Sequence, residues 1–274
     1  MPKSAKSSPS PRSALRAALA ALLWGAAAFP AAAQDSGRPA VKIRPKLERA
    51  RDSAGLLAPD ANLIDVPTAA VIDYGGFSTR SRFYSGGGVL QYLNFGVFHG
   101  LNLGASLSID ALVGSEKTVR VRAPNLQVKY RFYDGTRVLP ALALGFDGQG
   151  YNYNQRDKRY NHRQRGFFVA ATQELGLPGL QAHPSFNISD FDSNSLFGAI
   201  PLSYTIEDKV TLMTEWDNIN NFSDSRFNAG LRVYMTPQLA LDFAVRSIGQ
   251  GGRFPNGDSR GPERIVQIGY SGAF

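Results

Sequence analysis

Residues 101–111 read Leu-Asn-Leu-Gly-Ala-Ser-Leu-Ser-Ile-Asp-Ala, a strict alternation of apolar residues with polar or small ones. Successive side chains of an extended chain point to opposite faces. Leu103 and Leu107 therefore share one face, and Asn102 and Ser106 share the other. This period of two residues predicts a β-strand with one apolar face and one polar face.

The same period recurs along the chain from about residue 68. It predicts strands near residues 68–77, 88–98, 101–111, 124–133, 137–150, 166–175, 180–189, 197–206, 210–217, 227–235, 239–247 and 264–274. The connections between these strands would be long and short in strict alternation. Outer-membrane barrels have short periplasmic turns and long external loops, whereas a soluble sandwich has no reason for such an asymmetry.

The polar faces of these strands are rich in Asn, Ser, Gln and Gly and carry only scattered charges, as the interior of a membrane barrel does. A sheet inside a bilayer must also close on itself, because no unpaired edge can face lipid. We therefore predict an all-β fold, a transmembrane antiparallel up-and-down β-barrel in the bacterial outer membrane. About 12 strands are expected, and 10 or 14 also fit the pattern.

The amino terminus has the composition of an export signal. Residues 1–16 are basic, residues 17–29 are apolar, and Pro30-Ala31-Ala32-Ala33 supplies small residues for cleavage. Residues 1–33 are expected to be a signal peptide, with a short membrane anchor as the alternative. Residues 34–61 are expected to form a flexible basic periplasmic linker and residues 62–274 the barrel.

Composition excludes several classes of function. The 274 residues include no cysteine, which excludes a disulfide scaffold, a thiolate zinc site and a thiol nucleophile. The formal charge is +8, but from residue 53 onward 20 basic residues face 19 acidic ones. Because the excess lies in the signal and the linker, we expect no nucleic-acid partner.

The chain ends on Phe274, with Tyr270 four residues before it, and every second residue from Val266 through Ile268, Tyr270 and Gly272 to Phe274 lies on the same face. This ending resembles the carboxyl-terminal signature of bacterial outer-membrane barrels. The resemblance implies that Tyr270 and Phe274 form an assembly signal recognised by the barrel-assembly machinery.

A narrower resemblance lies at Asn62-Leu63-Ile64-Asp65-Val66-Pro67-Thr68-Ala69. This stretch resembles the Gly-Leu-Ile-Asn-x-Pro-Ser-Ala opening of YjbH-type outer-membrane proteins, with Asp65 in place of the usual Asn. The resemblance implies an association with exopolysaccharide production.

Several charged residues fall on the polar faces of the predicted strands. The candidates for lumen-facing residues are Asp110, Lys129, Arg131, Glu215, Asp217, Arg232, Asp242 and Arg246. If the turn at Thr236-Pro237 sets the register, Arg232 and Asp242 lie opposite each other, and Glu215 and Arg246 lie at a similar height. Such charges could brace the wall or form a selective constriction.

The predicted external loop at residues 151–165 combines tyrosines with basic residues. Arg156, Lys158, Arg159, Arg163 and Arg165 are candidates for contacts with lipopolysaccharide phosphates, which arginine recognises well. A solvated basic loop is the alternative.

Catalytic patterns are scarce. His183 and Ser185 share one strand face and resemble the His-x-Ser pair of outer-membrane lipid hydrolases, but Phe197 stands where those enzymes have a third polar residue. We therefore expect a structural pair, no catalytic residue, no metal and no cofactor.

The expected protein is a monomer in contact with outer-membrane lipid. It would be a narrow passive channel or a barrel associated with polysaccharide export or biosynthesis. The alternatives are a structural or adhesive barrel and, last, a lipid hydrolase using His183 and Ser185.

Overall fold

The computed structural model describes residues 57–114, 118–154, 158–162, 164–189, 196–221, 225–254, 257 and 259–274. Antiparallel strands close into a ring of 12 positions, because β1 pairs with both β2 and β16. The wall strands are β1 (Gly76–Tyr84), β2 (Gly88–Phe98), β3 (Leu101–Asp110), β5 (Asn125–Tyr133), β6 (Ala141–Asp147), β9 (Gly166–Glu174), β10 (Leu180–Ala182) with β11 (Ser185–Ile188), β12 (Phe197–Ile206), β13 (Val210–Asp217), β14 (Arg226–Tyr234), β15 (Leu239–Ile248) and β16 (Glu263–Ala273).

The strands β10 and β11 share one position between β9 and β12. Pro184, which has no backbone N–H to donate, lies at the break between them. Outside the ring, β4 (Arg120–Val121) extends the pairing of β3, and β7 (Tyr151–Asn154) pairs with β8 (Arg159–His162). The predicted closed barrel of about 12 strands is confirmed. None of the described residues forms a helix long and apolar enough to cross a membrane.

The predicted first strand, at residues 68–77, is wrong. The wall begins only at Gly76, and residues 68–75 are not part of it. The connection between β1 and β2 is the three-residue turn η1 (Ser85–Gly87), so the alternation of long and short connections fails at this first position. The other predicted strands lie within a few residues of observed ones, and the remaining external connections are longer than the turns at the opposite end.

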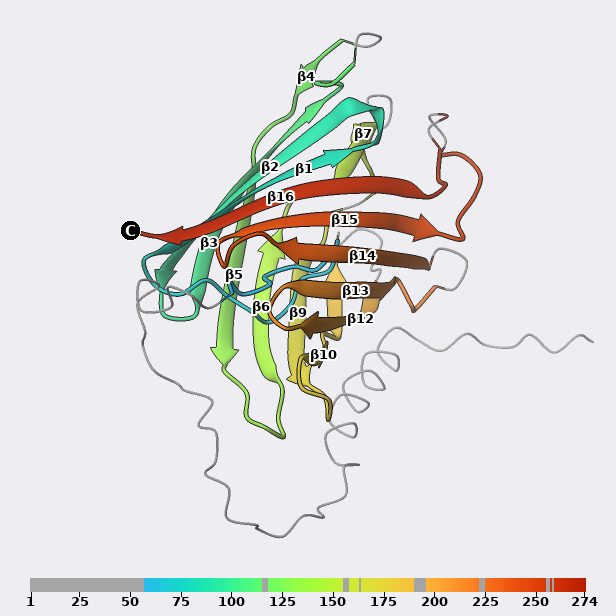
Figure 1. The fold of residues 1–274 in the computed structure, drawn as a ribbon. Helices are drawn as coiled ribbons and strands as arrows, with labels where there is room; N and C mark the ends of the chain where they lie inside the picture. Colours follow the sequence, from blue (N-terminus) through green and yellow to red (C-terminus); the bar gives the residue numbers. More distant parts are fainter. Residues whose placement is uncertain are drawn as a thin grey trace, which may run out of the picture. The chain divides into compact units, whose positions relative to one another are not determined.

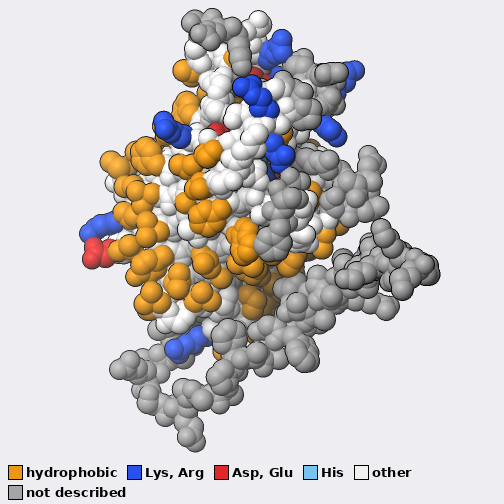
Figure 2. All heavy atoms as spheres, turned by 90° about the vertical axis from the view of Figure 1, so that its right-hand side faces the viewer, with side chains coloured by type: hydrophobic (Ala, Val, Ile, Leu, Met, Phe, Trp, Pro, Cys, Tyr) orange, Lys and Arg blue, Asp and Glu red, His pale blue; other side chains and the backbone are white. Residues whose placement is uncertain are grey.

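The outside of the barrel is apolar (Figure 2). Leu103, Leu126, Val128 and Phe243 are exposed, whereas their strand neighbours Asn102, Lys129 and Asp242 are buried on the inner face. A closed barrel with apolar side chains outside and polar ones inside is the arrangement that a bilayer requires. This arrangement supports the predicted outer-membrane location. Basic side chains gather at the end that bears β4 and β7, as Figures 1 and 2 show together.

The inside of the barrel is not empty. Residues 57–72 run through it between the two sides of the wall, as the blue segment in Figure 1 shows. Leu63, Ile64, Val66 and Ala69 are completely buried there. We call residues 57–72 the plug. Residues 34–61 are predicted to form a periplasmic linker, but residues 57–61 of this range lie inside the barrel.

The end of the barrel with the short turns also carries a cluster of aromatic rings. The ring of Phe274 lies 5.2 Å from that of Phe77 and 6.1 Å from that of Phe95, measured between centroids. The Phe274 N–H donates to Gly75 O over 2.9 Å. The carboxyl terminus is therefore held against the start of the wall, at the end we assign to the periplasm.

Candidate functional site: the plugged lumen

The plug folds into a small loop of its own. Leu63 N donates to Val66 O over 3.1 Å, and Thr68 N donates to Ala61 O over 3.1 Å. The Thr68 hydroxyl donates to Asp60 O and accepts from Ala70 N. These bonds turn the chain back on itself around residues 63–66, which places consecutive backbone amides at the tip of the loop.

Glu215 on β13 binds this tip. One of its carboxylate oxygens accepts from the backbone N–H groups of Ile64, Asp65 and Val66 over 2.8, 2.9 and 2.9 Å. The other oxygen accepts from Asn228 Nδ2 over 2.8 Å. Glu215 is fully buried. Three consecutive amides around one carboxylate form the kind of concave anion site that a bent backbone provides, so the wall supplies the anion and the plug supplies the site.

Asp65, at the tip of the plug, binds two arginines of the wall. Its Oδ1 lies 2.6 Å from Arg82 Nη1 on β1, and its Oδ2 lies 3.3 Å from Arg246 Nη1 on β15. Arg165 Nε also donates to the Asp65 backbone oxygen over 3.2 Å. Burial raises the pKa of the Asp65 carboxyl, but the charges of Arg246, Arg82 and Arg165 outweigh it and hold that pKa well below its usual range. Asp65 is therefore ionised in the closed barrel.

A tyrosine from the external side meets this cluster. The Tyr151 ring, at the start of β7, lies 4.7 Å from the guanidinium carbon of Arg82 and 4.6 Å from that of Arg246. Its hydroxyl contacts Arg82 Nη1 and Tyr92. Cation–π contacts of this kind gain strength when they are shielded from water. The loop between β6 and β9 thus reaches into the barrel and covers the tip of the plug.

The other carboxylate of the plug, Asp60, belongs to the same network. It accepts from Arg232 Nη1 on β14 and from the Tyr234 hydroxyl. Arg232 also forms a bidentate pair with Asp242 on β15, over 2.7 and 2.8 Å. Gln267 on β16 then joins Asp242 to Arg82. The two plug carboxylates are therefore connected through four wall side chains on four adjacent strands, β14, β15, β16 and β1.

The second half of the plug is held on the opposite side of the wall. Asn102 on β3 exchanges two hydrogen bonds with the Ile72 backbone, over 2.7 and 2.8 Å. The Lys129 ammonium on β5 donates to Ala61 O and Ala70 O. The Thr172 hydroxyl on β9 accepts from Ala69 N over 2.9 Å. The backbone polar groups of the plug thus find partners on both sides of the barrel, as a buried segment without regular structure requires.

Apolar contacts complete the seat of the plug. Leu63 and Ile64 pack in one buried cluster with Met213, Ala244 and Ile265 of the wall. Gly230 on β14 leaves the space that Ile64 fills, since a Cβ at this position would lie 3.2 Å from Ile64 Cδ1.

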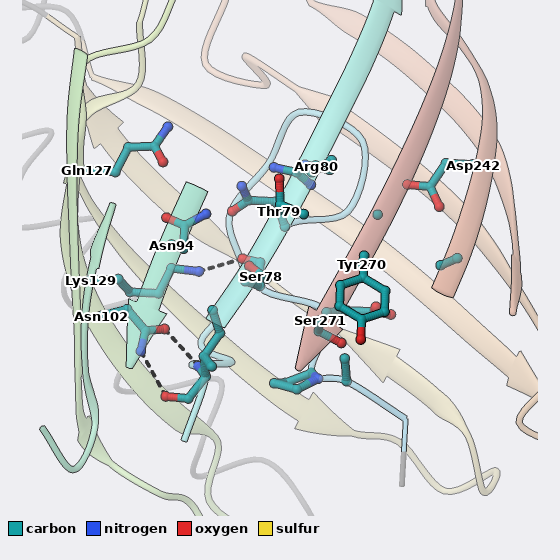
Figure 3. A pocket seen from close by; sticks show the side chains of 18 of the residues that line it. Ser78, Thr79, Arg80, Asn94, Asn102, Gln127, Lys129, Asp242, Tyr270 and Ser271 are labelled. Atoms are coloured by element: carbon teal, nitrogen blue, oxygen red, sulfur yellow. Dashed lines mark hydrogen bonds between the residues drawn. The ribbon is translucent and has the colours of Figure 1, made fainter. Parts of the chain in front are cut away.

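A cavity lies toward each end of the barrel. The one at the periplasmic end has a volume of about 130 Å³. Figure 3 shows Asn94, Gln127 and Lys129 on one side of it and Asp242 and Tyr270 on the other, with Arg80 between them. The external one has a volume of about 400 Å³, and Arg165, Arg226 and several asparagines line it. Polar side chains dominate the lining of the external cavity, whereas apolar residues such as Ile72, Val128 and Phe168 share the lining of the periplasmic one.

The structure places the predicted lumen residues as follows. Lys129, Glu215, Asp217, Arg232, Asp242 and Arg246 are buried inside the barrel. Arg232 and Asp242 are in register and in contact, as expected. Glu215 bonds to Asn228 and the plug, and Arg246 pairs with Glu263 and Asp65, so each has partners other than those anticipated. Asp110 binds Tyr84 and Arg122, and Arg131 pairs with Asp134 in a short turn, both toward the ends of the barrel.

The basic residues of the 151–165 loop do not share one surface. Lys158 and Arg159 are exposed on the β7–β8 hairpin. Arg165 points inward and forms a bidentate pair with the buried Asp217, over 2.8 Å at both oxygens. This position is unsuited to the predicted contact with lipopolysaccharide. Arg156 and Arg163 lie outside the described residues.

His183 and Ser185 do not form a catalytic pair. The two ring nitrogens of His183 lie 3.0 Å from the Thr172 hydroxyl and 2.9 Å from the Ser203 hydroxyl. Ser185 is buried in the wall. Because the imidazole is bound to other hydroxyls, it is not placed to take a proton from Ser185. Within the described ranges, no group of three or more histidine, aspartate or glutamate side chains could hold a metal ion.

Sequence reasoning missed the plug, Arg82 and Tyr151. Residues 76–84, Gly-Phe-Ser-Thr-Arg-Ser-Arg-Phe-Tyr, do carry a two-residue period that would have placed Arg82 inside the barrel. The apolar residues of the plug looked like the first strand instead. Pro67 gave no signal against that strand, because it precedes the predicted start at residue 68 and proline is tolerated where a strand begins.

Comparison with known proteins gives neighbours at the level of structure. No protein family matches the sequence, and no curated protein does. Among solved structures, a KdgM porin matches with 10% identity and a TM-score of 0.47, over 71% of this chain and 98% of that one. A KdgM porin in complex with disordered oligogalacturonate matches with 10% identity and a TM-score of 0.45, over 73% and 99%. A NanC porin matches with 12% identity and a TM-score of 0.39, over 72% and 99%.

Proposed function

We propose that this protein is an outer-membrane channel that its own residues 57–72 hold closed. The observation that supports it best is the seat of the plug, in which Glu215 binds three consecutive plug amides while Arg82 and Arg246 bind Asp65. A 12-strand ring is wider than the eight-strand barrels that side chains alone can fill. Here the plug fills the lumen, and only hydrogen bonds, ion pairs and apolar contacts hold it there, so it can leave and return.

The character of the wall favours a passage over a solid core. Behind the plug, the inner face carries buried charged and amide side chains, among them Lys129, Glu215, Asp217 and Gln267. These groups are paired with one another or with the plug in the closed barrel, and the charged and amide side chains that the plug covers would be hydrated when it moves.

A steric substitution tests this proposal. Gly230→Leu would place a side chain where Ile64 Cδ1 now lies and so push the plug away, and it replaces none of the charged residues of the wall. Gly269→Leu on β16 is the matched control, because a Cβ there meets nothing within 4 Å. In planar bilayers, Gly230→Leu should show long openings, whereas wild type and Gly269→Leu should stay mostly closed.

The contradictory result is a folded Gly230→Leu barrel, shown by heat-modifiable migration, that passes no current. That outcome would favour the structural or adhesive barrel, in which the plug is a permanent part of the core. The association with exopolysaccharide rests on the resemblance of residues 62–69, which are plug residues. Unchanged exopolysaccharide after deletion of the gene would contradict that part of the proposal.

A further inference from the structure

The carboxylate of Asp65, in the plug, is bound by arginines of the barrel wall. The Asp65 side chain lies between Arg82 and Arg246, whose guanidiniums approach its two oxygens from different strands. Both arginines are almost completely buried, and each has a second wall partner, Gln267 for Arg82 and Glu263 for Arg246. These wall partners remain in the chain when Asp65 is replaced.

The charges of this network balance only when the plug is included. Among the described residues, the wall and the end of the β6–β9 loop contribute six basic side chains to it, namely Arg82, Lys129, Arg165, Arg226, Arg232 and Arg246. They contribute four carboxylates, Glu215, Asp217, Asp242 and Glu263. The excess is therefore two positive charges, and the plug brings two negative ones, Asp60 and Asp65.

Of the other charged side chains in this region, Arg260 lines the external cavity beside Arg165 and Arg226, and several more have a partner of opposite sign. Arg80 and Asp147 line the same periplasmic cavity and are of opposite sign. Asp110 pairs with Arg122, and Arg131 pairs with Asp134. Displacement of the plug would thus remove two carboxylates from this network and leave the two guanidiniums of the Arg82–Arg246 site with one carboxylate, that of Glu263.

We propose that the Arg82–Arg246 site is the anion-selecting site of the channel and that Asp65 occupies it as a built-in substitute for a carboxylate-bearing solute. A solute with a carboxylate would take the place of Asp65 between the two guanidiniums, which pair with carboxylates in a directional way. Tyr151, stacked on both arginines, would form one side of the same site. This inference rests on the proposed channel function and names the class of solute for it.

Chemical rescue tests the site without any measurement of current. Asp65→Ala removes the built-in carboxylate from the full chain and leaves the arginines in place. Sodium acetate should raise the unfolding temperature of Asp65→Ala in a saturable way. Acetamide, which has the same shape without the charge, and sodium chloride at equal ionic strength should not. Asp134→Ala, which removes a carboxylate from an exposed turn, is the control that acetate should not rescue.

Two further variants keep the outcome decisive. Arg82→Met in addition to Asp65→Ala should abolish the effect of acetate. If Asp65→Ala does not fold, Asp65→Gly, which also vacates the space of the carboxylate, serves in its place. An acetate effect no larger than that of acetamide or chloride on a folded variant would overturn the proposal.

Ion selectivity separates this inference from the channel proposal. The Gly230→Leu barrel should be more permeable to chloride than to potassium, as the sign of its reversal potential would report. If acetate stabilises Asp65→Ala but the Gly230→Leu barrel passes no current, the anion site is supported and the channel proposal is contradicted. Two results would support the channel and contradict the anion site. One is a conducting Gly230→Leu barrel that is more permeable to potassium than to chloride. The other is a conducting Gly230→Leu barrel together with an Asp65→Ala chain that acetate does not stabilise.

Discussion

Asp65 shows how one side chain connects the plug to the wall. Two buried guanidiniums depend on it, and removal of one partner from a buried ion pair costs more than the pair contributes when intact, because it strands the other charge. Its position could not be predicted from the sequence, since it depends on which residues the barrel encloses. The pairing of Arg232 with Asp242 could be predicted, because a four-residue turn sets the register of β14 and β15.

The first prediction concerns Asp65. Asp65→Asn should lower the free energy of unfolding by about 3–5 kcal/mol, since Arg82 and Arg246 both lose their shared carboxylate. Urea unfolding of the detergent-folded protein would measure it. Asp134→Asn, which breaks an exposed pair, should cost about 1 kcal/mol or less. Equal losses in the two variants would show that Asp65 is not a buried anchor.

The pH dependence of that loss follows from the lowered pKa of Asp65. A carboxyl whose pKa is lower in the folded than in the unfolded state contributes stability above its unfolded pKa of about 4 and loses it in more acid solution. The difference between wild type and Asp65→Asn should therefore be constant from about pH 8 to pH 5 and shrink below about pH 4. A difference that already falls between pH 8 and pH 6 would contradict this prediction.

The third prediction concerns Arg232 and Asp242. Arg232→Met alone strands the buried Asp242 and should cost about 3–5 kcal/mol. Arg232→Met with Asp242→Leu should cost less than the single change, because it leaves no unpaired charge at that pair, while Asp60 keeps the Tyr234 hydroxyl. Additive losses in this double-mutant cycle would mean that the pair carries no coupling.

At the scale of elements, strands followed from the sequence and the plug did not. The period of two residues located β2, β3, β5 and β13 almost to the residue, because one face of each strand meets lipid and the other does not. Most of residues 63–72 are apolar for a different reason, since Leu63, Ile64, Val66, Ala69 and Val71 are buried inside the barrel. A half-buried strand and a buried irregular segment can have similar apolar content, and this similarity explains the misplaced first strand.

The last strand carries the fourth prediction. Phe274 packs on Phe77 and Phe95 at the rim and is bound through its N–H to Gly75, so it joins the two ends of the wall. Phe274→Asp should reduce assembly into the outer membrane, because it removes the terminal aromatic and places a charge near the lipid interface. The fraction of heat-modifiable protein in the outer membrane is the measurement. Normal assembly of Phe274→Asp would contradict the role of Tyr270 and Phe274 as an assembly signal.

At the scale of the whole molecule, the barrel and its location could be read from alternation and closure. Whether the lumen is open or plugged could not be predicted, because the plug precedes the first wall strand and does not change the spacing of the strands. The charges that line the lumen were visible in the sequence, yet their partners were not. Arg246 and Glu215 lie at similar heights, but the plug lies between the wall strands and binds both.

The central claim is that movement of the plug opens the barrel, and a reversible lock tests it most directly. The chain has no cysteine, so Ala69→Cys with Thr172→Cys introduces a single pair, at a point where Ala69 N now meets the Thr172 hydroxyl over 2.9 Å. In a Gly230→Leu barrel carrying this pair, single-channel current should be absent under oxidising conditions, appear after reduction and vanish on reoxidation. Current of the same size and frequency in both redox states would contradict the account.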